Sequence, residues 1–311
     1  MNSLRTCVHE YLVMRRALGF KLKKYERLLL DFVAFMERRR AKRITVRLAL
    51  TWTKQTKSTD QNYRAQRLRA VRGFASYRSG IDPRTEIPQP DLLPRDKRRL
   101  QPYLYTEDEI RRILVACLQR RRGATPISRW TRFTMFGLLS VTGMRVGEAL
   151  RLDLQDVDLD QGVLTIRSTK FGKSRLVPLH ASTRAVLKHY LQQRNEFLMG
   201  RAVAPFFISP LGIRVTHSVV NKSFVRLSWK LGLRDRSARR GPRLHDLRHR
   251  MAVEVLLRCY REGADPERRL PALSTYLGHT NLSHTYWYLH QHPSLMKHGV
   301  ERLERHWENS I

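Results

Sequence analysis

Six residues between positions 145 and 288 have side chains that could act together on a phosphodiester. They are Arg145, Lys170, His245, Arg248, His279 and Tyr288. A guanidinium donates two parallel, charge-assisted hydrogen bonds to paired phosphate oxygens, so two arginines suit the charge that nucleophilic attack adds to a phosphate. A phenol is a possible nucleophile, but its pKa of about 10 means that it needs a base or a cationic pocket. Histidine can assist that deprotonation, and lysine can protonate a departing oxygen.

The first arginine lies in a glycine turn between two expected helices. An apolar helix is predicted over 130–139, Gly143 follows it, and a new helix is expected to begin at Glu148. An arginine at the mouth of such a turn, backed by buried apolar residues, is held in place. Taken alone, Arg145 fits a solvated or helix-capping role at least as well as a phosphate site. The accompanying residues favour the phosphate site.

The other candidates also have simple alternatives when each is taken alone. His245 and Arg248 are three positions apart, so they project from the same face of a helix. His245 could cap that helix, and Arg248 could pair with Asp246 or Glu254. His279 could be a C-terminal helix cap, and the tyrosine could be an ordinary half-buried aromatic residue. The occurrence of all six residues in this order favours the catalytic interpretation.

The charge of the chain indicates a polyanionic partner. The 311 residues include 60 Lys and Arg against 27 Asp and Glu, which gives a formal net charge of +33. The chain is also 41% hydrophobic with five Trp, so it folds rather than remaining a disordered polycation. Its length is sufficient for two domains with a substantial core. Nucleic acid is therefore the expected partner.

Cysteine usage and hydropathy indicate a protein of the reducing cytoplasm. Three cysteines lie far apart without a CxxC pair, which argues against a disulfide framework and against a zinc ribbon. No apolar run is long enough to span a membrane, and no signal-peptide core is present at the N-terminus. The sequence also lacks the clustered acidic triad of a two-metal nuclease, so neither a metal nor another cofactor is expected.

An all-helical, basic domain is predicted over residues 1–79. Apolar residues recur at three- and four-residue spacing, and the last helix of this region places aromatic residues on one side and cations on the other. The cations predicted to contact DNA phosphates are Arg64, Arg67, Arg69 and Arg72. A basic, proline-rich linker is expected over 80–104, because five prolines there exclude a helix or a central strand.

The second domain, 105–311, is predicted to be mostly helical with a small antiparallel sheet. A capping box begins a helix at Thr106, and a β-hairpin joins 162–167 to 175–179. Its tip contains two lysines, Lys170 and Lys173. A short strand is expected over 205–208, and further helices continue to the C-terminal region. Lys173 and Arg243 are additional candidates for DNA contact.

Four short motifs make the chain resemble the tyrosine recombinase, or phage integrase, family. They are T-G-x-R-x-x-E at 142–148, R-x-x-P-L at 175–179, H-x-x-R at 245–248 and L-G-H at 277–279. In this family the catalytic lysine lies on a β-hairpin that precedes the R-x-x-P-L motif, which corresponds to Lys170. In this family the nucleophilic tyrosine follows the last histidine by nine residues, which corresponds to Tyr288. Tyr286 lies two residues earlier and remains an alternative nucleophile, and Lys173 remains an alternative to Lys170.

The resemblance implies a mechanism and an architecture. Arg145 and Arg248 would stabilise the transition-state charge, and Glu148 would orient the first of them. The family cleaves DNA through a covalent 3′-phosphotyrosyl intermediate that needs neither ATP nor a metal. The resemblance also implies a two-domain, C-shaped clamp on double-stranded DNA. Such clamps assemble on DNA as a homotetramer or together with related recombinase subunits. The region around the tyrosine is similar to that of transposon-borne members, which act in the integration and excision of mobile elements.

Two other functions are compatible with the same residues. A type IB topoisomerase uses the same cleavage chemistry without partner exchange, so relaxation without synapsis would distinguish it. A DNA-binding accessory protein with a decayed site is the alternative outside enzymology. The intact set of six residues argues against that alternative.

Overall fold

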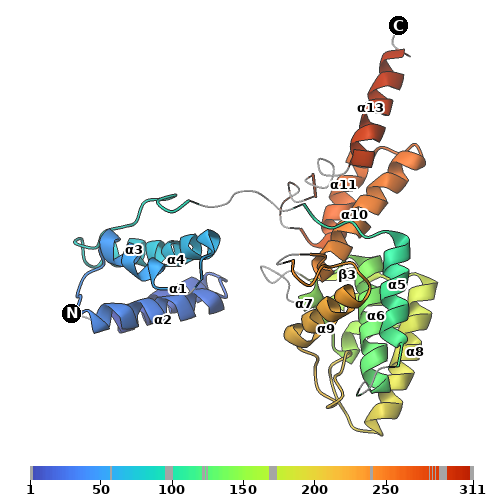
Figure 1. The fold of residues 1–311 in the computed structure, drawn as a ribbon, viewed down its shortest axis with the longest axis horizontal. Helices are drawn as coiled ribbons and strands as arrows, with labels where there is room; N and C mark the ends of the chain where they lie inside the picture. Colours follow the sequence, from blue (N-terminus) through green and yellow to red (C-terminus); the bar gives the residue numbers. More distant parts are fainter. Residues whose placement is uncertain are drawn as a thin grey trace. The chain divides into compact units, whose positions relative to one another are not determined.

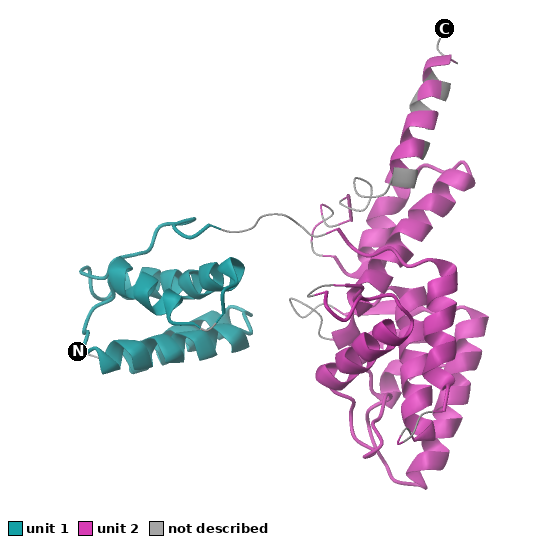
Figure 2. Cartoon of the chain, in the orientation of Figure 1, with its two compact units in different colours: residues 1–100 teal, residues 101–311 magenta. Residues whose placement is uncertain are grey.

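The computed structural model describes residues 3–56, 58–94, 101–120, 123, 125–167, 174–238, 241–279, 281, 283, 285–286 and 293–308. The chain divides into two compact units, residues 1–100 and 101–311 (Figure 2). The predicted clamp shape concerns the placement of one unit relative to the other, and it stays a prediction.

Unit 1 is a helical domain, as predicted. Its helices are α1 (Leu4–Ala17), α2 (Lys23–Arg38), α3 (Val46–Lys54) and α4 (Gln61–Ser79) (Figure 1). Ser3, Thr45 and Asp60 cap three of these helices by accepting hydrogen bonds from backbone N–H groups that the helix leaves unpaired. The apolar face of α2 and the aromatic side of α4 enclose the core, where Phe32 meets Trp52 edge to face at a ring-centroid distance of 5.2 Å.

The first part of the predicted linker packs onto unit 1. The backbone N–H of Glu86 donates to the Ile44 carbonyl at 3.0 Å, and its carboxylate accepts from the Val46 N–H at 2.7 Å. Asp82 and Thr85 are buried. Residues 80–94 therefore extend the helical unit beyond the boundary expected at residue 79, because their backbone groups find partners there. Residues 95–100 of the linker lie outside the described part of the chain.

Unit 2 is mostly helical with one small sheet. Its elements are α5 (Glu107–Leu118), α6 (Pro126–Thr142), α7 (Val146–Ala149), the 3-10 helix η1 (Leu154–Asp156), β1 (Val157–Asp158), β2 (Val163–Ile166), β3 (Arg175–Pro178), α8 (Ala181–Leu198), α9 (His217–Lys230), α10 (Leu244–Arg261), α11 (Pro266–Leu277) and α13 (Pro293–Glu308). The predicted capping box of α5 is confirmed by reciprocal hydrogen bonds of 2.8 and 3.1 Å between Thr106 and Glu109.

Helix α6 is central to unit 2, where it packs against α5, α8 and α10. Buried side chains of α6 such as Phe136 and Leu139 belong to the main core of this unit. The sheet is antiparallel in the order β1-β2-β3, and Ile166 pairs with Arg175 at the end of the predicted hairpin. Residues 168–173 of the predicted hairpin tip, 168–174, lie outside the described residues.

One predicted element differs in the structure. The short strand expected over 205–208 is reduced to two isolated bridges, Asp153 with Pro205 and Ile208 with Arg214. Phe206, Phe207 and Ile208 are buried, so this apolar run serves the core without forming a ladder. Among the described residues, no helix combines the length and the apolar character that crossing a membrane requires.

Candidate functional site

Arg145 stands at the N-cap of α7, in the turn that the glycine motif predicts. Helix α6 ends because Gly143 adopts a left-handed φ of 59°. The Glu148 carboxylate then accepts from the Arg145 backbone N–H at 2.9 Å and from its Nη1 at 2.8 Å. Nη2 of Arg145 donates to the Gly278 carbonyl at 3.0 Å. The guanidinium is fixed on two sides while its side chain remains 37% exposed.

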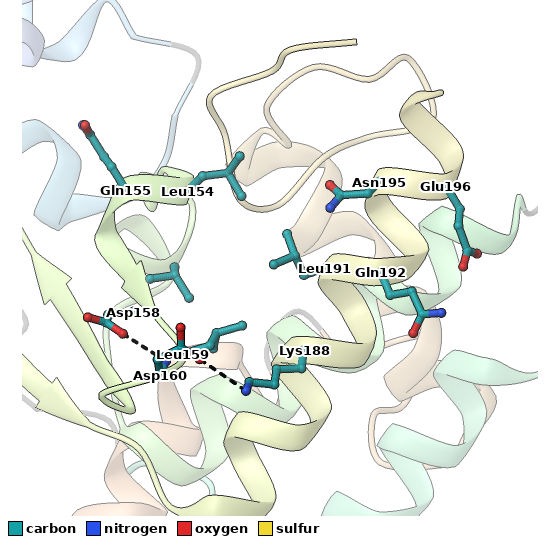
Figure 3. A pocket seen from close by; sticks show the side chains of 11 residues that line it. Leu154, Gln155, Asp158, Leu159, Asp160, Lys188, Leu191, Gln192, Asn195 and Glu196 are labelled. Atoms are coloured by element: carbon teal, nitrogen blue, oxygen red, sulfur yellow. Dashed lines mark hydrogen bonds and ion pairs between the residues drawn. The ribbon is translucent and has the colours of Figure 1, made fainter. Parts of the chain in front are cut away.

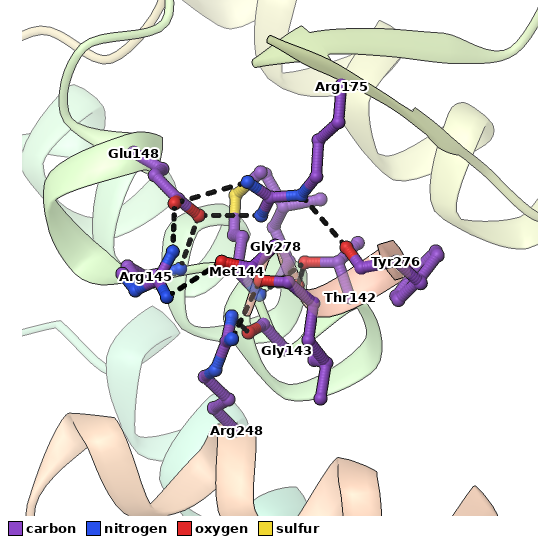
Figure 4. A network of polar contacts seen from close by, with 11 residues as sticks. Thr142, Gly143, Met144, Arg145, Glu148, Arg175, Arg248, Tyr276 and Gly278 are labelled. Carbon is purple, nitrogen blue, oxygen red and sulfur yellow. Dashed lines mark hydrogen bonds and ion pairs between the residues drawn. The ribbon is translucent and has the colours of Figure 1, made fainter. Parts of the chain in front are cut away.

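Arg248 reaches the same place from α10 and is buried. Its Nη1 donates to the Gly143 carbonyl at 2.8 Å, and its Nη2 donates to the Leu277 carbonyl at 2.7 Å (Figure 4). Arg145 and Arg248, predicted from two separate motifs, are thus brought together by the turn after α6 and the end of α11. Asp246, one of the two partners considered for Arg248, accepts from Nη2 of Arg243 at 2.8 Å.

Glu148 is a buried anion that two arginines hold. Burial raises the pKa of its carboxyl, but hydrogen bonds from Arg175, from the Arg145 backbone and from the Arg145 side chain outweigh burial and bring the pKa to about 2. The group is therefore charged at any physiological pH. This anion offsets part of the repulsion between the cations that meet around it.

His245 lies in the first turn of α10, near Arg248. Desolvation by the surrounding protein lowers the pKa of its imidazole, and the positive charge of Arg248 lowers it further. The ring of His249 is perpendicular to it at a centroid distance of 4.9 Å. A lowered pKa keeps His245 neutral at neutral pH, which is the form that can accept a proton.

His279 follows Gly278, whose left-handed φ of 67° ends α11. Its Nδ1 and the Thr285 hydroxyl are 2.8 Å apart, and Thr285 is fully buried. When the hydroxyl donates to Nδ1, the ring proton is on Nε2, which can then donate to a phosphate oxygen. The sequence interpretation missed Thr285. The only signal available was a hydroxyl residue six positions after the histidine, which is too common to single out.

Three predicted site residues lie outside the described part of the chain. They are Lys170, Lys173 and Tyr288. Their roles stay predictions, and so does the choice between the two lysines. The alternative nucleophile Tyr286 is described, with 42% of its surface exposed.

The predicted DNA-contacting arginines of α4 do not behave alike. Arg67 is only 6% exposed, and its guanidinium lies 3.7 Å from the ring centroid of Trp52. It also donates to Asp31 at 3.2 Å and to the Trp52 carbonyl at 3.1 Å. The assignment of Arg67 to DNA contact is wrong, because this side chain stabilises the helical core. Arg69 is exposed and Arg64 and Arg72 are half-buried, so their roles stay predictions.

Arg243, a candidate for DNA contact, lies at the start of α10 with an exposed side chain. It caps α10, and Asp246 accepts from its backbone N–H at 2.9 Å and from its Nη2 at 2.8 Å. This pattern repeats the one of Arg145 and Glu148, an arginine at the N-cap with a buried acid three residues later. The arginine side chain is 49% exposed, so its DNA-contact role also stays a prediction.

One hollow in unit 2 is separate from these residues. It has a volume of about 790 Å³ and lies between the β1 region and α8, where Lys188 and Asp160 form an ion pair of 3.5 Å (Figure 3). Its walls include Leu154, Leu159 and Leu191. No predicted catalytic residue that the structure describes lines it, so the candidate site is a charged cluster rather than this hollow.

Comparison with known proteins decides the family. Residues 104–294 match the model of the phage integrase family. The chain belongs to this family. It is 49% identical to "Putative integrase/recombinase y4rB" of Sinorhizobium fredii, over 99% of both chains. It is 30% identical to "Tyrosine recombinase XerD" of Caulobacter vibrioides, over 76% of this chain and 73% of that protein.

Two solved structures are similar to this chain in fold. The Tn1549 transposon integrase in complex with transposon right end DNA has a TM-score of 0.67 at 16% identity, covering 96% of this chain and 99% of that one. The site-specific recombinase XerH bound to its difH substrate has a TM-score of 0.65 at 21% identity, covering 92% of this chain and 80% of that one. These likenesses confirm the predicted fold class of a mostly helical protein with a small antiparallel sheet.

Proposed function

We propose that this member of the phage integrase family is an active site-specific DNA recombinase. The observation that supports this most strongly is the convergence of Arg145 and Arg248. The two guanidiniums come from different helices, are fixed by a buried carboxylate and by backbone carbonyls, and are accompanied by His245 and His279. A fixed cluster of this kind suits the extra negative charge of a phosphate under attack.

The two arginines supply the electrostatic part of catalysis in this proposal. Each donor that is already in position before the reaction is worth on the order of 3–4 kcal/mol in the transition state. His279, with Thr285 on its Nδ1, directs its second ring nitrogen to a nonbridging oxygen. Because these groups are fixed by the fold, little free energy is lost in orienting them during the reaction.

The covalent step transfers the phosphate from DNA to tyrosine. Tyr288 gives up its proton with the assistance of His245, and its oxygen forms a bond to the scissile phosphorus. The bond from phosphorus to the 5′ oxygen breaks, and Lys170 protonates that oxygen. The 3′-phosphotyrosyl bond conserves the energy of the broken strand, so the reverse reaction joins a new 5′ hydroxyl without ATP.

The proposed substrate is double-stranded DNA, and the proposed process is integration or excision of a mobile element. The net charge of +33 favours binding to a polyanion. The relatives named as a transposon integrase and as recombinases support the process. Recombination joins two duplexes that are each cut on both strands, so a homotetramer on DNA is the proposed assembly.

A nicked suicide duplex carrying the element's own end sequence tests the proposal. Incubation without metal or ATP should produce an SDS-resistant adduct, and mass spectrometry should locate it on Tyr288. An adduct on Tyr286 would keep the reaction and correct the nucleophile. Absence of an adduct on a genetically identified site would contradict the proposed activity.

The pH dependence of cleavage tests the role of His245. The lowered pKa of His245 means that the neutral form persists below the ordinary histidine value of about 6.5. We expect the cleavage rate to stay constant down to that pH and to decline only at lower pH. A decline that begins above pH 7 would contradict the assignment of His245 as the base.

A further inference from the structure

Three consecutive backbone carbonyls at the end of α11 accept hydrogen bonds from three different arginines. Arg175 Nε donates to Tyr276 at 2.8 Å, Arg248 Nη2 to Leu277 at 2.7 Å and Arg145 Nη2 to Gly278 at 3.0 Å (Figure 4). The last carbonyls of a helix lack partners within it and form the negative end of its dipole. The end of α11 therefore brings three like charges together and offsets part of their repulsion.

Arg175 is the one arginine of the three that the proposed mechanism does not use. It is the first residue of β3, and its side chain is only 11% exposed. Its Nη2 and Nη1 donate to the two oxygens of Glu148 at 2.7 and 3.2 Å. Glu148 is thus shared between Arg175, whose side chain is 11% exposed, and Arg145, whose side chain is 37% exposed.

The contact between Arg175 and the end of α11 leaves little room for a side chain at Gly278. A Cβ atom at Gly278 would lie 2.8 Å from Nη1 of Arg175 and 3.1 Å from its Cζ. The left-handed φ of 67° at Gly278 is a second, independent reason for glycine there. The guanidinium of Arg175 therefore lies directly against the residue whose carbonyl holds Arg145.

We propose that Arg175 is a positioning residue, which acts on Arg145 through Glu148 and the end of α11. Without Arg175, this carboxylate would keep only the backbone and side-chain hydrogen bonds of Arg145, whereas the planar fork of Arg175 holds both of its oxygens. Arg145 then presents its remaining N–H groups in one direction. This inference rests on the proposed recombinase activity and adds a residue that is not itself expected to touch DNA.

Arg167 provides a matched control. It follows β2 and precedes the predicted hairpin tip, whereas Arg175 follows that tip, so the two arginines flank the same loop. Arg167 also pairs with a buried carboxylate, but this is Asp156, at 2.5 Å, rather than Glu148. Arg167→Gln and Arg175→Gln therefore remove the same charge from two sides of one hairpin.

The test compares strand cleavage of an ordinary suicide duplex with cleavage of one that has a methylphosphonate at the scissile position. At saturating DNA, Arg175→Gln should cleave the ordinary substrate about 100-fold more slowly than the wild type, whereas Arg167→Gln stays within about threefold. The methylphosphonate lacks the charge that Arg145 stabilises. The ratio of the wild-type cleavage rate to the Arg175→Gln cleavage rate should therefore be smaller by about tenfold or more on that substrate.

Two results would overturn the proposal. The first is a cleavage rate of Arg175→Gln equal to that of Arg167→Gln. The second is the same loss of cleavage rate on both substrates, which a general loss of folded protein would produce. If Arg175→Gln does not fold, Arg175→Lys retains the charge without the planar fork and is compared in the same way. A wild-type protein that cleaves neither substrate would instead contradict the proposed activity itself.

Discussion

Two arginine–carboxylate pairs, one in each unit, contain the same chemical groups arranged in opposite ways. In unit 1 the arginine is buried and the acid is exposed, with side-chain exposures of 8% for Arg67 and 52% for Asp31. In unit 2 the acid is buried and the arginine is exposed, with 2% for Glu148 and 37% for Arg145. The buried partner fixes the pair to the fold, and of the two paired arginines Arg145 is the one whose side chain stays accessible.

The largest expected effect is on the pair in unit 2. Arg145→Ala should reduce the cleavage rate by about 100- to 1,000-fold, because a positioned donor to the transition state is lost. DNA affinity should change little, since one phosphate contact among many is removed. Cleavage rates and filter-binding titrations on the same duplex measure both. Activity within threefold of the wild type would contradict the assigned role.

The buried acid of that pair should dominate acid stability. Because the pKa of Glu148 is depressed to about 2, its contribution is fully present above the unfolded value and is lost as pH falls from there towards 2. The contribution amounts to at most about 3 kcal/mol. Urea unfolding from pH 5 to pH 2 should show a steep loss for the wild type, and Glu148→Gln should flatten that part of the curve. Equal slopes would show that Glu148 is not held as described.

The pair in unit 1 should affect folding rather than chemistry. Arg67→Ala removes the stacking on Trp52 and the hydrogen bonds to Asp31 and to the Trp52 carbonyl, which should cost about 2–3 kcal/mol of unfolding free energy. The cleavage rate at saturating DNA and low temperature should be unchanged. A normal unfolding midpoint with a large loss of DNA affinity would instead restore Arg67 as a contact residue.

The smallest effect is expected at Arg69, the exposed neighbour of Arg67 on α4. Arg69→Ala should leave unfolding free energy within about 0.5 kcal/mol of the wild type. If Arg69 contacts a phosphate, the slope of log K against log salt should become shallower by about 0.9. Binding titrations at several salt concentrations provide this slope. An unchanged slope would remove Arg69 from the interface.

Local patterns were sufficient to predict most of the fold. Apolar spacing predicted the helices of both units, and the pairing of Thr106 with Glu109 predicted the start of α5 correctly. The helical unit continues past the boundary expected at residue 79. The reason is that the Glu86 N–H donates to the Ile44 carbonyl, a partner that is distant in sequence. The strand predicted over 205–208 was wrong for a related reason. An apolar run can be buried in a core without pairing along its length with another strand.

The sequence by itself determined which residue types are present and in what order, and this order was sufficient to predict that Arg145 and Arg248 belong together. Only the tertiary structure decided how each arginine is used. Arg67 faces inward, Arg175 holds Glu148, and Thr285 meets His279. The physical reason is that these roles depend on which buried group each side chain meets. Such partners come from helices and strands that are far apart in the chain, and local spacing contains no information about them.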